Sequence, residues 1–177
     1  MSTHSKKLPI FEILSLAIAL LCGFLIGYLK YSGKCLTVSN KIQNDYLTEY
    51  ILKSNSKLSE ETALLITSEI DQCANVSGLD EEIVAGILSV ESNFNPRAIG
   101  PGGLGIGQVN PAVWNGATFE VSRAIRHSCR ILISCLVRNK DILTNSLVCY
   151  NGKGDKQFSK KVLKKYSEIH GKKMGWK

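Results

Sequence analysis

The sequence predicts an all-α, mostly helical domain preceded by one N-terminal transmembrane helix. Beyond residue 59, apolar residues recur every three or four positions, as they do on one face of a helix. No segment shows the alternation of a β-strand, and no internal repeat divides the chain. Residues 13–29 contain no charged side chain. We therefore expect a membrane segment, a linker, and one domain over residues 59–177, which is long enough to bury its own core.

Residues 13–29 are expected to form an uncleaved signal anchor, with residues 1–12 in the cytoplasm. As a helix this run would be about 26 Å long, close to the bilayer core of about 30 Å. It is longer than the core of most signal peptides, and no small-x-small cleavage site follows it. A cleaved signal peptide is the alternative. A lipoprotein site at Cys22 is disfavoured because the preceding Leu21 is large.

A tether and a first helix are expected after the anchor. Residues 30–58 are polar and mixed, which is typical of a tether, with one short helix over residues 41–53. Ser59 is a suitable N-cap for a helix over residues 60–76, and Gly78 is suited to end it. We assign the apolar positions of this helix to Leu64, Leu65, Ile70 and Cys73.

The next helix carries an acidic residue on its apolar face. Asp80 is a suitable N-cap, and Pro96 should end the helix near Asn95. Glu91 continues the apolar stripe formed by Ile83, Val84, Ile87 and Leu88. Burial disfavours a charged carboxyl, so we expect a raised pKa and a side chain able to act as a general acid. The alternative is a side chain that turns outward or pairs with Arg97.

A glycine-rich loop follows this helix. Five of the eight residues from 100 to 107 are glycine, so the backbone can approach a ligand closely. The loop contains a G-x-G-x-x-G match, but a helix rather than a strand precedes it, which excludes a dinucleotide site. Gln108, Pro111 and Trp114 come soon after the glycines and favour the wall of a binding groove. A flexible surface loop is the alternative.

A regular helix is expected over residues 119–140, with core-facing positions at Val121, Ile125, Ser128, Leu132 and Cys135. The cysteines outside the apolar run are Cys35, Cys73, Cys129, Cys135 and Cys149. Cys129 and Cys135 lie too far apart on one helix to join comfortably, whereas a bridge from Cys73 or Cys35 to a later cysteine and a set of buried thiols are both open. The chain has three histidines and no C-x-x-C, so we expect no metal and no cofactor.

The segment ESNFNPRAIGPGGLGIGQVNP, residues 91–111, resembles the signature of the soluble-lytic-transglycosylase-like domain, which has the lysozyme-like fold. The shared residues, in the family's order, are Glu91, Ser92, Phe94, Asn95, Pro96, Ala98, Gly103, Gly105, Gln108 and Pro111. The pair Tyr150-Asn151 is similar to the family's Tyr-Asn segment, and residues 158–166 are similar to its closing helix. The resemblance covers roughly residues 79–166 and implies a lysozyme-like fold.

Six positions depart from the family's pattern. Gly107 stands where the family usually has Met, and Gly100 where it often has Ser. The family's usual Tyr-Asn-Ala-Gly reads Tyr150-Asn151-Gly152-Lys153 here. Ala124 and Ser128 replace an Asn and an internal Gly in the following helix. The acid is retained, so these departures bear on the shape of the groove and on substrate preference.

The resemblance implies a peptidoglycan lytic transglycosylase, which cleaves the β-1,4 bond between N-acetylmuramic acid and N-acetylglucosamine. Glu91 would protonate the glycosidic oxygen and then, as a base, draw a proton from the sugar's own 6-hydroxyl, giving a 1,6-anhydro sugar. This route needs no second carboxylate, unlike paired-carboxylate glycosidases. The next acidic residues are Glu120, Asp141 and Asp155, and none lies in the loop after Glu91.

The resemblance assigns substrate or positioning roles to Ser92, Gln108, Tyr150 and Asn151, with a plain core aromatic as the alternative for Tyr150. A hydrolytic lysozyme on the same fold and a non-catalytic wall-binding scaffold are the alternative functions. The domain would face the periplasm or cell wall from an inner or virion membrane. Its partners would be glycan strands and, by analogy, a secretion, conjugation or virion complex.

Charge is concentrated at the C-terminus. The net charge is +7, and residues 153–177 hold nine lysines against Asp155 and Glu168. We expect this Lys153–Lys177 tail to be attracted to anionic wall polymers or membrane headgroups, with a plain solvated surface as the alternative. A nucleic acid partner is not expected, because the tail lacks interleaved aromatic residues and any known nucleic-acid motif.

Overall fold

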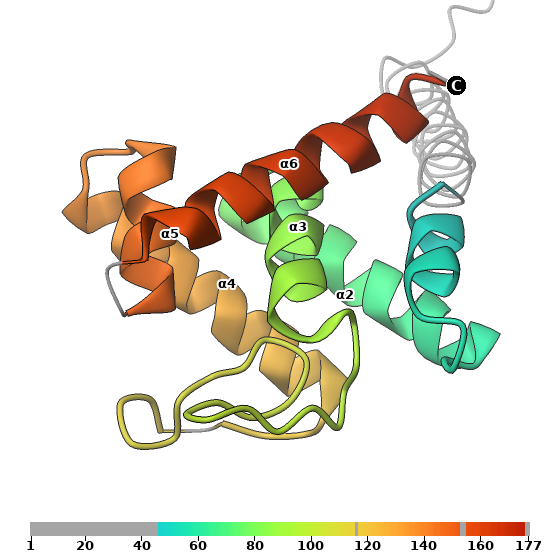
Figure 1. The fold of residues 1–177 in the computed structure, drawn as a ribbon, viewed down its shortest axis with the longest axis horizontal. Helices are drawn as coiled ribbons and strands as arrows, with labels where there is room; N and C mark the ends of the chain where they lie inside the picture. The colour runs from blue at the N-terminus through green and yellow to red at the C-terminus, as the bar shows by residue number, and fades with distance from the viewer. Residues whose placement is uncertain (1–45, 116, 153–154, 176–177) are drawn as a thin grey trace, which may run out of the picture. The chain divides into compact units, whose positions relative to one another are not determined.

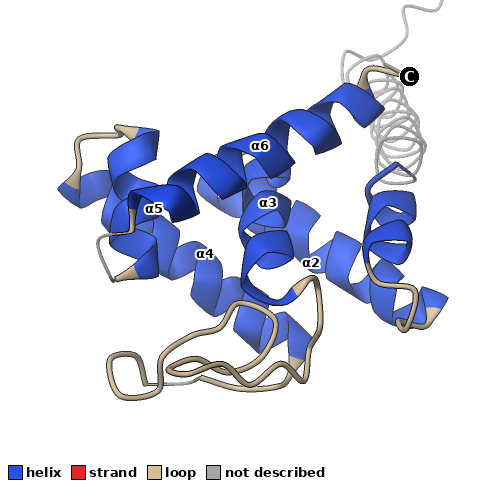
Figure 2. Cartoon of the chain, in the orientation of Figure 1, coloured by secondary structure: helices blue, strands red, loops and turns tan. Residues whose placement is uncertain are grey.

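The computed structural model describes residues 46–115, 117–152 and 155–175, and these form a mostly helical unit (Figure 2). A helix at residues 46–54 is followed by α2 (Glu60–Ser77), α3 (Glu81–Ser92), α4 (Val121–Arg138), α5 (Leu143–Asn151) and α6 (Lys156–Lys173). Within these ranges the extended pairing is limited to two isolated bridges, Ile99–Leu104 and Leu104–Val109. The all-α prediction is confirmed at this level.

The ends of α2 and α3 follow from local sequence. The Ser59 side chain accepts from the Thr62 N–H, and Gly78 ends α2 in the left-handed region with φ of 69°. The Asp80 side chain accepts from the Glu82 N–H at the start of α3. Helix α3 ends at Ser92, a few residues before the proline that was expected to stop it. The predicted boundaries of both helices are therefore confirmed within a turn.

Helix α6 lies across α3 (Figure 1). Gly86 allows this close approach, because a Cβ at that position would stand 3.1 Å from the Val162 carbonyl oxygen. The shared apolar cluster consists of Ile83, Ile87, Leu132, Leu147, Phe158 and Val162. The lysine-rich C-terminal segment is thus a helix with one buried face, and its charges lie on the other faces.

A second cluster surrounds α2 and the helix at residues 46–54. Leu47 and Ile51 are fully buried there, so these residues belong to the core, although the sequence placed residues 30–58 in a tether. Leu64 and Leu65 are 50% and 44% exposed, and their assignment to the buried face of α2 was wrong. The buried face is rotated from them and consists of Ala63, Ile66, Thr67, Ile70 and Cys73.

Two disulfides join the helices. Cys73–Cys129 links α2 to α4, with Cα atoms 6.5 Å apart, and Cys135–Cys149 links α4 to α5, with Cα atoms 5.7 Å apart. A bridge from Cys73 to a later cysteine was one of the alternatives left open by the sequence.

The expected anchor at residues 13–29 lies outside the described residues, as does Cys35. Among the helices of the described part, none combines the length and the apolar character that a membrane span requires.

Candidate active site

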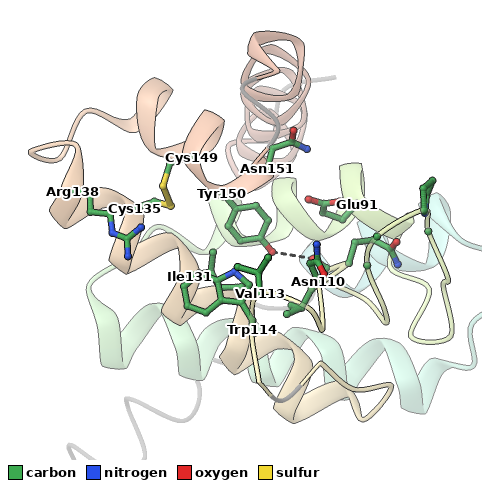
Figure 3. Close-up of a pocket in the computed structure, with 18 residues that line it drawn as sticks. Glu91, Asn110, Val113, Trp114, Ile131, Cys135, Arg138, Cys149, Tyr150 and Asn151 are labelled. Carbon is green, nitrogen blue, oxygen red and sulfur yellow. Dashed lines mark hydrogen bonds between the residues drawn. A yellow bond between two sulfur atoms is a disulfide. The ribbon is translucent and has the colours of Figure 1, made fainter.

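Glu91 stands on the last turn of α3 and lines a cavity of about 490 Å³ (Figure 3). The glycine-rich loop forms one wall, one face of α4 forms a second, and the end of α5 forms a third. The main lining residues are Glu91, Gly103, Gly107, Gln108, Val109, Asn110, Val113, Trp114, Ile131, Cys135, Arg138, Cys149, Tyr150 and Asn151. Of the predicted site residues, Glu91, Gln108, Tyr150 and Asn151 therefore meet at one cavity.

Ser92 ties the end of α3 to the glycine-rich loop. Its hydroxyl lies 2.7 Å from the Ile106 carbonyl oxygen and 3.2 Å from the Leu88 carbonyl oxygen, and it can donate its proton to either. The side chain is not part of the cavity lining. Its hydrogen bonds hold the loop beside the acid, so any contribution to binding is indirect.

Gln108 braces the loop from within. Its side-chain amide donates to the Gly105 carbonyl at 2.9 Å and to the Ala98 carbonyl at 3.2 Å. A Cβ at residue 100 would overlap the amide oxygen of Gln108, which accounts for glycine at that position. The Gln108 side chain thus both shapes the loop and forms part of the cavity wall.

Tyr150 connects α5 to the same loop. Its hydroxyl donates to the Gly107 carbonyl oxygen at 3.1 Å (Figure 3). Its ring stacks on Phe158, with ring centroids 6.0 Å apart. Burial and then the negative charge of Glu91 raise the pKa of the Tyr150 phenol, while a hydrogen bond with Ser128 acts in the opposite direction. The phenol therefore stays protonated at neutral pH and remains a donor close to the acid.

Asn151 lines the cavity and carries a buried acceptor without a hydrogen-bond partner in the described part of the chain. Its side-chain oxygen Oδ1 is buried and has no hydrogen-bond partner among the described residues. In Figure 3 the Asn151 side chain lies on the same side of the Tyr150 ring as Glu91. A buried oxygen of this kind is uncommon in folded proteins.

The wall formed by α4 was not identified from the sequence. Ile131, Cys135 and Arg138 follow one another at steps of four and three, so they share one helix face, and that face lines the cavity. The sequence analysis named Cys135 as a core-facing position and did not assign Ile131 or Arg138. Trp114 completes this side and packs edge-on against His127, with ring centroids 6.2 Å apart. Pro111, expected beside it in the groove wall, does not line the cavity.

Glu91 is the only acidic residue that lines the cavity in the described part of the chain. Glu120, Asp141 and Asp155, the next acids along the sequence, lie elsewhere: Glu120 caps α4 and Asp155 caps α6. The cavity thus holds a single carboxyl group among hydrogen-bonding and apolar side chains.

Comparison with known proteins identified no matching family model, no matching curated protein and no matching solved structure.

Proposed function

We propose that this protein is a peptidoglycan lytic transglycosylase with a lysozyme-like helical fold and Glu91 as its acid. The observation that carries the proposal is the single carboxyl group of the cavity. Glycosidases that rely on two carboxylates place both within about 10 Å of each other across the scissile bond. A cavity with one acid suits a reaction in which the same group first gives and then takes a proton.

In the proposed reaction, Glu91 donates its proton to the glycosidic oxygen as the bond from that oxygen to the sugar C1 breaks. The Glu91 carboxylate then takes the proton of the 6-hydroxyl on the same sugar, and that oxygen bonds to C1. The products are a chain with a free 4-hydroxyl and a 1,6-anhydro end, and no water is consumed. Tyr150 stays protonated beside the acid and holds the loop backbone through Gly107.

The polar lining supports a sugar ligand. Asn151 lines the cavity, and its side-chain amide can exchange hydrogen bonds with the acetamido and hydroxyl groups of an amino sugar. Gln108 and the glycine-rich loop present backbone close to the cavity, where flat sugar rings could lie against it. Trp114 adds an aromatic surface of the kind that packs on the apolar faces of sugars.

Two departures from the family pattern compensate for each other, which supports the resemblance. The family usually has Met at the position of Gly107 and Gly at the position of Ser128. Here the larger residue is on α4 and the glycine is on the loop, and a Cβ at residue 107 would overlap the Ser128 hydroxyl. The Ser128 side chain on α4 therefore occupies the space that a side chain at residue 107 would take from the loop. This is expected if the loop and the helix meet as they do in the family.

The proposal includes the compartment and the partners. Two disulfides suit an oxidising environment outside the cytoplasm. We place the domain at the periplasm or cell wall, held by residues 13–29 in an inner or virion membrane. The exposed lysines of α6, such as Lys160, Lys161 and Lys164, would attract anionic wall polymers or headgroups. Local opening of the wall for phage entry, secretion or conjugation is the proposed use.

The test is digestion of purified peptidoglycan by the full chain in detergent, with mass spectrometry of the released fragments. We expect 1,6-anhydro ends with the parent protein and no release with Glu91→Gln. Glu61→Gln, an exposed acid in the first turn of α2, is the matched control and should leave release unchanged. Fragments heavier by one water, with reducing ends, would identify a lysozyme. Binding without release by the parent would favour a wall-binding scaffold.

A further inference from the structure

The cavity has one cationic lining residue in the described part of the chain, Arg138. Arg138 is in the last turn of α4, and Glu91 is at the end of α3. In Figure 3 the two side chains lie on opposite sides of the Tyr150 ring. A ligand with its reacting bond at Glu91 would therefore extend past Tyr150 to reach the guanidinium.

Arg138 differs from Arg123 and Arg126, which lie earlier on α4. Arg123 pairs with Glu120 at 3.3 Å, and Arg126 pairs with Glu69 at 3.2 Å. Arg138 makes no ion pair with any residue that the structure describes, and it is exposed. The helix dipole favours a cation in the last turn of a helix. This preference alone does not explain why the Arg138 side chain lines the cavity.

The backbone that carries Arg138 is held in place. Cys135, one turn earlier on the same face, forms the disulfide to Cys149, which immediately precedes Tyr150. The Asn139 side chain donates to the Cys135 carbonyl at 2.7 Å and so secures the end of the helix. The guanidinium therefore extends from a backbone that is fixed relative to the Tyr150 wall.

We propose that Arg138 is a specificity-determining residue that binds a carboxylate carried by the glycan substrate. The inference rests on the proposed function. A guanidinium offers a planar pair of N–H donors that matches a carboxylate, and such charge-assisted pairs are stronger than neutral hydrogen bonds. Wall glycan carries carboxylates in two places, on the peptide stems and, where the stem has been removed, on the lactyl ether. A neutral β-1,4-linked N-acetylglucosamine chain carries none.

The test is binding to full-length protein in detergent in a Glu91→Gln background, so that the ligand is not consumed. Three tetrasaccharides serve as probes: wall glycan with its peptide stems, the same glycan after removal of the stems, and chitotetraose. Adding Arg138→Gln should weaken binding of at least one acidic probe about tenfold and leave chitotetraose unchanged. Arg138→Lys should recover part of the loss. Arg130→Gln, an exposed arginine of α4 outside the cavity lining, should change nothing.

The outcomes separate the two proposals. A loss confined to the stem-bearing probe assigns the partner to a peptide carboxylate, and a loss confined to the stripped probe assigns it to the lactyl group. A loss on both acidic probes shows that Arg138 binds either carboxylate. Equal losses on all three probes, or no loss on any, would overturn the role of Arg138. Failure of the Glu91→Gln protein to bind any probe, together with no fragment release by the parent, would overturn the proposed function itself.

Discussion

Gly107 lies so close to Ser128 that a Cβ on residue 107 would overlap the Ser128 side-chain oxygen. Gly107 is on the loop that follows the acid, and Ser128 is on the buried face of α4. The Tyr150 hydroxyl also belongs to this contact, because it donates to the Gly107 carbonyl. The size of one residue therefore limits the size of the other, and together they set how closely the loop approaches α4.

We expect Gly107→Ala to lower the free energy of unfolding by about 1–3 kcal/mol through overpacking. Ser128→Gly alone should lower it by about 1 kcal/mol, because glycine is unfavourable within a helix. The double variant should lose less than the sum of the two, with a coupling of about 1–2 kcal/mol, since the added methyl group takes the vacated space. Denaturant unfolding of the four proteins measures all three values.

Gly102→Ala is the control for this cycle, since it lies in the same loop. A Cβ there would meet its nearest neighbour, the Asn110 side-chain nitrogen, at an ordinary 3.8 Å. It should change stability little, alone or together with Ser128→Gly. Strict additivity of Gly107→Ala and Ser128→Gly would contradict the contact.

The two disulfides should separate stability from activity. In the chain-entropy description, loss of Cys73–Cys129, with a sequence separation of 56, costs about 4 kcal/mol of stability. Loss of Cys135–Cys149, with a separation of 14, costs about 3 kcal/mol. Only the second bridge lines the cavity, next to Tyr150. The variant with both Cys73 and Cys129 changed to Ala should therefore have the lower free energy of unfolding. The variant with both Cys135 and Cys149 changed to Ala should have the lower rate of fragment release.

Both variants must be assayed at a temperature where each is folded, so that unfolding does not lower the rates. Far-UV circular dichroism under the assay conditions checks this. Equal rates for the two folded variants would show that the Cys135–Cys149 bridge does not position the site.

Two carboxyl groups at the start of α3 should make stability depend on pH. Burial, then the hydrogen bond and negative charge of Glu82, raise the pKa of Asp80 to about 6 from 3.8. Burial also opposes ionisation of Glu82, but hydrogen bonds with Asp80 and Lys173 outweigh it and lower the pKa of Glu82 to about 2 from 4.5. The two groups thus titrate in opposite directions relative to the unfolded chain.

The sign of each effect follows from these shifts. The contribution of Asp80 is fully present below about pH 3.8 and is lost as the pH rises through about 6. The contribution of Glu82 is present above about pH 4.5 and is lost as the pH falls through about 2. We expect Asp80→Asn, which keeps the N-cap, to remove the fall in stability between about pH 4 and 6.

Denaturant unfolding at half-unit pH steps measures this profile. Asp155→Asn is the matched control, because Asp155 caps α6 in the same way, accepting from the Gln157 N–H at 2.8 Å. It should leave the slope between pH 4 and 6 in place. A profile of Asp80→Asn parallel to that of the parent would contradict the assignment to Asp80.

The parts of the structure that depend on nearby residues were predictable from the sequence. Ser59, Gly78 and Asp80 act on their own helix ends through local hydrogen bonds and backbone geometry, so each sets a boundary wherever the helix packs. The position of Glu91 at the end of an apolar stripe was enough to place it at the edge of the core, where the cavity lies.

The parts that depend on distant partners were not predictable. Glu81 and Glu82 were interpreted only as favourable charges for the helix dipole, yet both are buried because Lys173 reaches them from α6 at 3.1 and 2.9 Å. No local pattern indicates this partner, which lies 92 residues from Glu81 and 91 residues from Glu82. Similarly, the stripe on α2 could not show that Leu64 and Leu65 face solvent, because that depends on which neighbours cover the helix.

The contact between α3 and α6 has a consequence for when the site can form. Gly86 is synthesised 76 residues before Val162, the residue whose backbone it meets. Until α6 has left the ribosome, Phe158 and Val162 are missing from the apolar cluster on the helix that carries Glu91, and Lys173 is missing from Glu81 and Glu82. The helix that carries Glu91 and the ring of Tyr150 therefore gain this support only after α6 has been made.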